Sequence, residues 1–415
     1  MTVDEIKQIG PELKAFMNQF ADCFGRCEPV EHARTYVCGQ LSDLPRKSIE
    51  PIADQAGIDP RALQKFVAQH KWKHQSLVER TCQITARDHA HRHAIGIIDE
   101  TSFVKKGTKT PGVQRQHCGA SGKKDNCTVT VHLGYHIPGF HCLLSSALFL
   151  PESWSNDRAR CREAGIPDEL VHRTKWQIAL ELHQEALKRG IQLDWVTADE
   201  YYGRPVEFHL ELSRRKQKYV VEVPSNFWCW CRKPKVVESR RGPRCSDYPS
   251  ISTVANLAGY SPAFAGQDWQ RYRIKDGTKG PIVWEAKAAP IYLKGEDGLP
   301  TGAHWLIVAR NSLNHEEVKY FVSNAPQDTP VAEILHVAFS RWRVERCFED
   351  YKTELGMDHF EVRTYDALMR HLALTAVSYL FLARLHQKLK KNAGVDGLPG
   401  AHSHECVSVL AETAG

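Results

Sequence analysis

Two short apolar stretches decide the fold of this chain, and each ends on an aspartate: His93-Ala94-Ile95-Gly96-Ile97-Ile98-Asp99 and Leu193-Asp194-Trp195-Val196-Thr197-Ala198-Asp199. Apolar runs of this length are typical of strands that are buried in an α/β sheet. In such sheets, functional side chains gather beyond the carboxyl ends of the strands. Asp99 and Asp199 are therefore the first candidate site residues.

The segments around these strands predict a mixed α/β core. Alternating or apolar patterns predict strands over residues 128–135 and 141–150, after a loop with several basic residues. An amphipathic helix over 171–189 follows, and Gly190 is a suitable residue to end it. The second aspartate strand, a helix at 205–215 and a strand at 218–223 complete the series. The basic residues of the loop are Lys105, Lys106, Lys109, Arg115, Lys123 and Lys124.

A later helix carries a third carboxylate. Pro330 predicts its first turn and Gly356 its end, which places Glu345 near its middle. At ~100° per residue, Arg341, Glu345 and Lys352 fall on one face of this helix. In this arrangement the glutamate can bind a metal ion that contacts one phosphate, and the two cations can bind the neighbouring phosphates. The alternative is a solvated surface helix with favourable charge spacing.

Three carboxylates on rigid elements suit a magnesium-dependent enzyme that acts on a phosphate backbone. Phosphodiester cleavage needs an activated oxygen nucleophile and a stabilised leaving oxygen, and two metal ions ~4 Å apart supply both. Magnesium prefers oxygen ligands and keeps several waters. Because clustered carboxylates without metal raise one another's pKa values, we expect the cation to be part of the active state.

Residues 1–92 are predicted to be helical and to include a DNA-binding arm. A helix at 48–56, a turn at Gly57 and a second helix at 61–70 have the layout of a helix-turn-helix. Asp59 is expected to cap the second helix, which is basic at Arg61 and Lys65. The alternative is an ordinary pair of helices with a solvated basic face.

Residues 224–301 break the α/β rhythm and are interpreted as a β-rich insertion with strands at 251–255, 270–274 and 282–288. Trp228 and Trp230 precede a basic cluster that begins with Arg232 and Lys233. Aromatic and basic side chains together suit a DNA surface. The alternative is a solvated loop with two core tryptophans. The other members of the basic cluster are Lys235, Arg240, Arg241 and Arg244.

After the insertion, strands are expected at 304–310 and 318–323, and a final apolar helix at 367–388. The 13 cysteines show no paired zinc-type spacing, although Cys229, Cys231 and Cys245 with a histidine remain a conceivable zinc cluster. The odd count and the lack of an export signal fit a reducing cytoplasm.

The longest apolar stretch, 372–383, is shorter than a membrane span requires, so no membrane partner is expected. Net charge is +6, a mild basic bias that permits nucleic-acid binding.

These motifs resemble a known family. The strands ending at Asp99 and Asp199, the insertion and the helix spacing of Arg341, Glu345 and Lys352 look like an insertion-sequence transposase of the DDE type, related to the insertion sequence four group. The tyrosine of that group's signature would fall at Ala338. Within the group, the chain most resembles the insertion sequence seven-hundred-and-one family over residues 40–385.

The resemblance implies a ribonuclease-H-like mixed sheet with flanking helices, interrupted by the insertion and preceded by a helical domain. It implies that Asp99, Asp199 and Glu345 bind two Mg²⁺ ions, with Mn²⁺ as a substitute, and catalyse cleavage and strand transfer. DNA ends and target DNA are the expected partners, in a homodimer near the bacterial nucleoid. A tryptophan at 228 or 230 would stack on a flipped base. The implied domains are 1–92, 93–223, 224–301, 302–362 and 363–415.

Other readings remain open. Five further carboxylates compete for the ligand roles, and Glu349, one turn after Glu345, is the nearest competitor. The chain could also be an inactive DNA-binding regulator descended from a transposase. A glycosidase using Asp99 and Asp199 as acid and base is a third reading, but it leaves the cations beside Glu345 without a role. The remaining competitors are Glu100, Asp194, Glu200 and Asp350.

Overall fold

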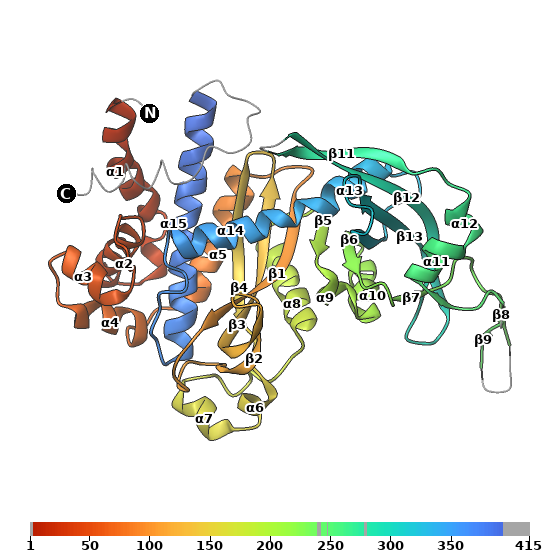
Figure 1. Cartoon of the computed structure of the whole chain (residues 1–415). Helices are drawn as coiled ribbons and strands as arrows, with labels where there is room; N and C mark the ends of the chain where they lie inside the picture. Colours follow the sequence, from red (N-terminus) through yellow and green to blue (C-terminus); the bar gives the residue numbers. More distant parts are fainter. Residues whose placement is uncertain (1–2, 239–241, 247, 278–279, 393–415) are drawn as a thin grey trace. The chain divides into compact units, whose positions relative to one another are not determined.

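The computed structural model describes residues 3–238, 242–246, 248–277 and 280–392 (Figure 1). It has the expected mixed α/β fold, with a large mixed sheet, flanking helices and helices at the N-terminus. The chain divides into two compact units, which are described separately. The described parts of Met1–His91, Asp99–Gln192 and Arg343–Gly415 form the first, and Arg92–Ile98 with Leu193–Trp342 form the second. Strand β1 (Ile95–Val104) contributes to both.

The first unit begins with the predicted helical segment. The local signals of the expected arm are confirmed: Gly57 has a φ of +64°, and the Asp59 carboxylate accepts a hydrogen bond from the Arg61 amide at 2.9 Å. The helices are α1 (Val3–Asn18), a 3₁₀ turn (Ala21–Cys23), α2 (Cys27–Gln40), α3 (Ile49–Gln55), α4 (Pro60–Ala68) and α5 (His74–Asp88).

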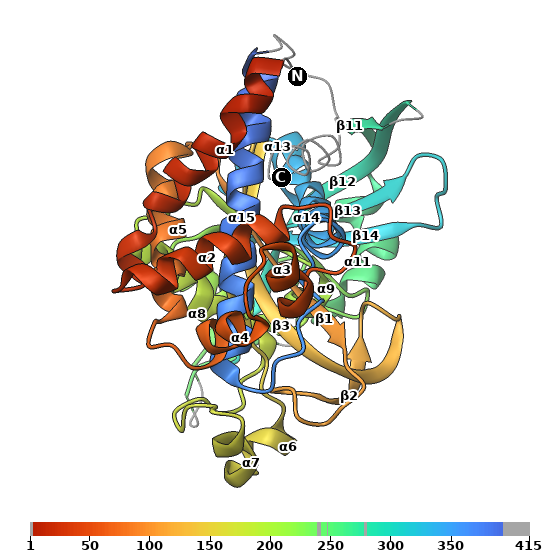
Figure 2. The ribbon, with the colours of Figure 1, turned by 90° about the vertical axis from the view of Figure 1, so that its left-hand side faces the viewer.

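Helix α15 (Tyr365–Asn392) is the core of these helices, and α2 and α5 lie along it (Figure 2). This confirms the predicted final apolar helix. Its length and composition would also suit a membrane span, but 83% of its most apolar window is buried inside the protein. Within the helix, the Arg370 guanidinium donates to the carbonyls of Val67 and Trp72 at 2.9 and 2.6 Å. The helix therefore anchors the end of α4.

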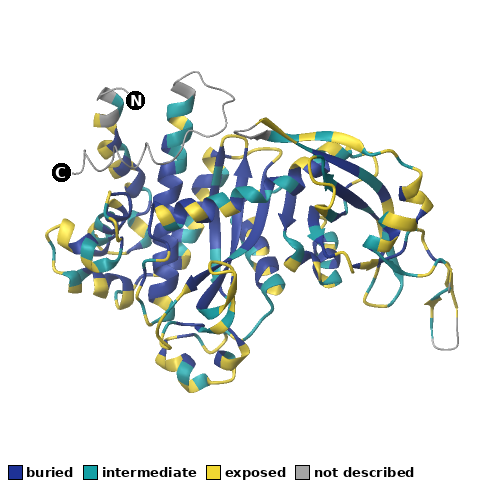
Figure 3. Cartoon of the chain, in the orientation of Figure 1, coloured by how far each residue is buried: buried dark blue, intermediate teal, exposed yellow. Residues whose placement is uncertain are grey.

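The sheet of the first unit contains the later part of β1 with β3, β2 and β4. Strand β3 pairs antiparallel with both β2 and β4 and is buried over its last eleven residues (Figure 3). The polar strand β2 lies in the stretch that was predicted as a loop. The elements are β2 (Gln114–Cys118), β3 (Lys123–Ile137), β4 (Phe140–Leu148), α6 (Glu152–Ser155), α7 (Arg158–Glu163), α8 (Lys175–Lys188) and α14 (Trp342–Thr353).

The second unit is built on a sheet whose order is β11-β12-β13-β14-β6-β5-β1. The pairs β1–β5 and β5–β6 are parallel, whereas the strands from β6 to β11 are antiparallel. The elements of its first half are β5 (Trp195–Ala198), α9 (Glu200–Gly203), α10 (Val206–Arg214), β6 (Lys218–Val223), β7 (Trp228–Cys229), β8 (Val236–Val237) and β9 (Arg244–Cys245). Those of its second half are β10 (Ser252–Thr253), α11 (Val254–Tyr260), α12 (Pro262–Ala265), β11 (Gln270–Gly277), β12 (Gly280–Lys294), β13 (Pro300–Asn311), β14 (Val318–Ser323) and α13 (Val331–Ser340).

The predicted insertion needs two corrections. Strands β11 and β12 extend the main sheet through β13, so the boundary at residue 301 falls inside β13. The strand predicted at 251–255 is only the two-residue β10, and the Thr253 hydroxyl caps helix α11 directly after it. The predicted division into five domains remains a prediction, beside the two compact units of the fold.

The predicted glutamate helix is also interrupted. Helix α13 ends at Ser340, Arg341 keeps helical angles of −52° and −39°, and α14 begins at Trp342. Glu345 therefore lies in the first turn of α14 and not in the middle of one long helix. Gly356, with a φ of +65°, follows the end of α14 as expected.

Candidate active site

The two candidate aspartates lie where the pairing of β1 with β5 stops. These strands pair in parallel register, with Ile95 opposite Trp195 and Ile98 opposite Ala198. Asp99 directly follows Ile98, and Asp199 directly follows Ala198. Asp99 is 9% exposed, and its Oδ1 accepts a hydrogen bond from the Glu100 amide at 2.8 Å. Strand β5 ends before Asp199 as predicted, but β1 continues to Val104, so the prediction that its strand ends at Asp99 was wrong.

Asp199 caps the short helix α9. Its Oδ1 accepts hydrogen bonds from the amides of Tyr201 at 3.0 Å and Tyr202 at 3.4 Å. Helix α9 lies close to β6, because a Cβ added at Gly203 would come within 1.9 Å of the Glu222 carbonyl oxygen. Only glycine fits at this position without a shift of α9 or β6.

Glu345 is exposed on α14, and the opposite face of that helix is packed on the first unit. Phe348 lies edge-on to His132 of β3, with ring centroids 5.0 Å apart. The Tyr351 hydroxyl accepts a hydrogen bond from the Leu143 amide of β4 at 3.3 Å. These contacts fix α14 on β3 and β4, so Glu345 stands on a rigid element.

A polar network of α14, α15 and β4 side chains holds α14 in place. Asp350 accepts from Arg346 at 3.2 Å and from the Tyr379 hydroxyl at 3.4 Å, and Tyr379 also bonds His141 Nε2 at 2.6 Å. Burial raises the pKa of Asp350, although Arg346 acts in the opposite direction. Burial lowers the pKa of His141 to about 4, so this imidazole is neutral at pH 7. Sequence reasoning missed this network, since Tyr379 and His141 have no positional signal.

Lys352, on the same helix as Glu345, points toward β1. Its Nζ lies 3.5 Å from the Ser102 carbonyl oxygen and 5.8 Å from the centre of the Phe103 ring. Burial lowers the pKa of Lys352. The predicted phosphate-binding lysine is therefore held next to the strand that carries Asp99.

Each competing carboxylate takes part in an ion pair. Glu100 pairs with Lys175 at 2.5 Å, Glu200 with Arg204 at 2.9 Å and Asp194 with Lys218 at 2.7 Å. Glu349 and Asp350 share Arg346. The choice of ligands among these carboxylates remains a prediction.

The three predicted ligands are divided between the units, with Asp99 and Glu345 in the first and Asp199 in the second. In the part of the chain that the structure describes, no group of three or more histidine, cysteine, aspartate or glutamate side chains lies close enough to hold a metal ion. The donor chemistry fits Mg²⁺, because carboxylate oxygens are its preferred ligands. The ligand set of Asp99, Asp199 and Glu345 remains a prediction.

The predicted DNA-binding residues differ in exposure. Arg61 and Lys65 are exposed on α4, and Arg232 and Lys233 are exposed after β7. Trp228 is 56% exposed, whereas Trp230 is 5% exposed and bridges to Tyr292 of β12. Burial of Trp230 corrects the expectation that it stacks on a base. Arg240 and Arg241 lie outside the described residues.

The cysteines of the second unit do not form the conceivable zinc cluster among the described side chains. Cys229 is buried, and burial raises the pKa of its thiol. The Cys245 thiol contacts the Gly298 carbonyl oxygen at 3.4 Å. These contacts are those of small core residues.

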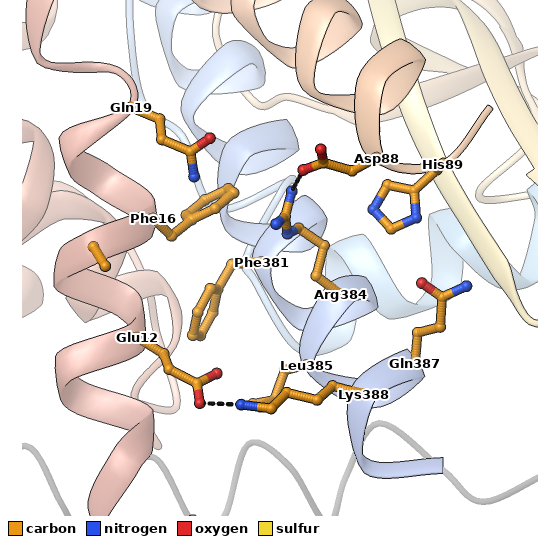
Figure 4. A pocket seen from close by; sticks show the side chains of 11 residues that line it. Glu12, Phe16, Gln19, Asp88, His89, Phe381, Arg384, Leu385, Gln387 and Lys388 are labelled. Carbon is orange, nitrogen blue, oxygen red and sulfur yellow. Dashed lines mark hydrogen bonds and ion pairs between the residues drawn. The ribbon is translucent and has the colours of Figure 1, made fainter. Parts of the chain in front are cut away.

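A cavity of about 460 Å³ lies among α1, the end of α5 and α15 (Figure 4). Phe16, Phe381 and Leu385 form its apolar part. The Asp88–Arg384 and Glu12–Lys388 ion pairs line it as well. None of the predicted catalytic residues lines this cavity, so it belongs to the packing of the helices.

Comparison with known proteins gives the family. A family model described as DDE superfamily endonuclease matches residues 19–281, which is more than half of the chain. The matched span includes Asp99 and Asp199 and ends before Glu345. Over 192 residues the chain is 30% identical to a protein of Microchaete diplosiphon named "Probable transposase for insertion sequence element IS701". That match covers 46% of this chain and 48% of the relative, so it spans about half of the relative's length. With the parallel strand pairing that stops just before Asp99 and Asp199, these matches show that the chain belongs to the DDE superfamily of endonucleases.

Proposed function

We propose that the protein is a DNA transposase that cleaves the ends of its element and joins the released 3′-hydroxyl to target DNA. The register of β1 and β5 is the observation that carries this proposal. Residues that directly follow paired positions of neighbouring parallel strands start from adjacent backbone positions, although β1 continues past Asp99 and β5 ends before Asp199. Asp99 and Asp199 are therefore suited to share divalent cations, and Glu345 completes the ligand set.

The chain's own residues supply binding and orientation. A bound pair of Mg²⁺ ions, with Mn²⁺ as a substitute, would activate the attacking oxygen and stabilise the leaving one. The carboxylate oxygens of Asp99, Asp199 and Glu345 would hold these cations at the scissile phosphate. Lys352 and Arg341 bind the flanking phosphates, because Lys and Arg side chains form strong charge-assisted hydrogen bonds to phosphate oxygens.

The proposed partners are the terminal inverted repeats of the element and the target duplex. Arg61 and Lys65 of α4, and Arg232 and Lys233 with Trp228, are exposed residues suited to bind DNA. A homodimer would hold two DNA ends, and the protein would act in the cytoplasm at the bacterial nucleoid.

The test is cleavage of a duplex that carries the element's own ends, with Mg²⁺ or Mn²⁺. Asp199→Asn keeps the shape of the side chain and removes its charge, and Glu200→Gln is the matched control at the next residue. We expect metal-dependent cleavage that is lost in Asp199→Asn and kept in Glu200→Gln. Binding without cleavage by the wild-type protein would instead favour an inactive regulator. Equal activity in the two variants would contradict the assignment of Asp199.

A further inference from the structure

The hairpin of β2 and β3 presents a basic face that none of the roles above uses. Arg115 pairs with Asn126 and His117 with Lys124, and paired residues of antiparallel strands share a face. The other face of the hairpin packs inward through Cys118, which is fully buried. We call the four residues Arg115, His117, Lys124 and Asn126 the outer face of the hairpin.

One further cation, Lys106, lies at the margin of the outer face. The Asn126 side chain donates to the carbonyls of Lys105 at 2.5 Å and Gly107 at 3.0 Å, which fixes the loop that carries Lys106 against β3. Lys123 is exposed at the hairpin's turn, but it pairs with Cys118 and so belongs to the opposite face. The cations therefore sit on a rigid frame, so binding a ligand would cost little ordering of the backbone.

These cations have no acidic partner. Lys106, Arg115, Lys123 and Lys124 are all exposed, and none forms an ion pair within the described residues. Neighbouring cations of the same unit are neutralised, since Lys109 pairs with Glu163 and Lys175 with Glu100. Unpaired positive charge is thus concentrated on the hairpin. It complements a polyanion.

The hairpin also adjoins Lys352 of α14. The Ser102 hydroxyl accepts hydrogen bonds from the Ala120 amide at 3.1 Å and the Cys118 thiol at 3.3 Å, both in the hairpin. The carbonyl of the same serine lies 3.5 Å from Lys352 Nζ. A phosphate chain bound at Lys352 would therefore continue over positive charge.

We propose that the outer face of the β2–β3 hairpin, with Lys106, binds the phosphate backbone of duplex DNA without reading its sequence. The proposal rests on the proposed function, because it extends the DNA path that begins at Lys352. Arginine and lysine contacts to phosphate release counterions, so the logarithm of the binding constant falls linearly with the logarithm of the salt concentration.

The test is binding of a short duplex of arbitrary sequence, measured by fluorescence anisotropy at several salt concentrations in the presence of a chelator. The variant is Arg115→Gln/Lys124→Gln, and the control is Lys7→Gln/Lys14→Gln, which removes the same charge from exposed positions of α1. We expect the hairpin variant to bind more weakly, with a salt slope reduced by about 2. The control should retain the wild-type slope, and the charge-keeping Arg115→Lys/Lys124→Arg variant should restore it.

The outcomes separate this proposal from the transposase activity, because binding is measured without divalent metal. A wild-type protein that cleaves its ends, with an unchanged slope in the hairpin variant, would overturn the hairpin proposal alone. Equal losses of slope in the hairpin variant and the α1 control would also overturn it. A reduced slope in the hairpin variant, with no cleavage by the wild-type protein, would support the hairpin proposal and overturn the proposed activity.

Discussion

Replacing Tyr379 by phenylalanine tests the network that supports the glutamate helix. The change removes one hydroxyl and keeps the aromatic ring, which stacks on Tyr351 at 4.3 Å between centroids. The lost hydroxyl bonds His141 Nε2 at 2.6 Å and Asp350 at 3.4 Å. Packing is therefore unchanged, and the effect isolates the polar contacts.

The magnitude follows from burial. Tyr379 is buried, and without its hydroxyl the His141 Nε2 loses this partner, whereas Asp350 keeps its contact with Arg346. An unsatisfied buried group costs about 1–3 kcal/mol, so we expect the free energy of unfolding to fall by about that amount. Cleavage should slow as well, because α14 carries Glu345.

The assay is urea unfolding of both the variant and a matched control. Tyr260 is 85% exposed, so Tyr260→Phe removes a tyrosine hydroxyl that is in contact with solvent. The control should change stability by less than about 0.5 kcal/mol. A Tyr379→Phe variant as stable as Tyr260→Phe would refute the reasoning that the network is satisfied and energetically important.

Three further predictions concern the same fold. Gly203→Ala would place a Cβ 1.9 Å from the Glu222 carbonyl oxygen, so we expect a large drop in melting temperature and loss of cleavage. The control is Gly259→Ala in α11, where the added Cβ meets no atom, so this variant should be neutral or stabilising. Similar melting temperatures for the two variants would contradict the close approach of α9 to β6. Asp59→Ala should cost about 1 kcal/mol in urea unfolding through loss of the α4 cap, and an unchanged midpoint would show that the cap is dispensable. Burial lowers the pKa of His132 to about 3 and the pKa values of four other histidines to about 4, namely His74, His141, His209 and His371. Below about pH 6.5 the unfolded chain therefore binds more protons than the folded protein, so the free energy of unfolding should fall as the pH falls toward 4. Equal urea midpoints at pH 7 and pH 5 would contradict this.

The sequence predicted the elements that have a strong local signal. The strands before Asp99 and Asp199 are short and apolar, and the Gly-Ile-Asp-Pro turn carries its own cap, so both could be placed without tertiary information. The break at Arg341 could not, because neither glycine nor proline marks it. Strand β2 was missed since its residues are polar and it is stabilised by pairing with β3.

The tryptophans show why exposure is harder to predict than secondary structure. Trp228 and Trp230 are two residues apart, so alternation along a strand would give them the same environment. The bridge between Trp230 and Tyr292 buries one of them and leaves Trp228 exposed. Likewise, the pairing of Ile98 with Ala198 follows from long-range strand register, which the two apolar runs by themselves leave open.

The central claim is that Asp99, Asp199 and Glu345 share bound divalent cations, and iron-mediated cleavage of the polypeptide tests it most directly. Ferrous iron accepts carboxylate ligands, and with ascorbate and peroxide it generates radicals that cut the backbone near the bound ion. We predict cuts next to residues 99, 199 and 345 that excess Mg²⁺ suppresses, and that Asp199→Asn abolishes while Glu200→Gln does not. Cuts at other positions, or cuts that persist in Asp199→Asn, would contradict the claim.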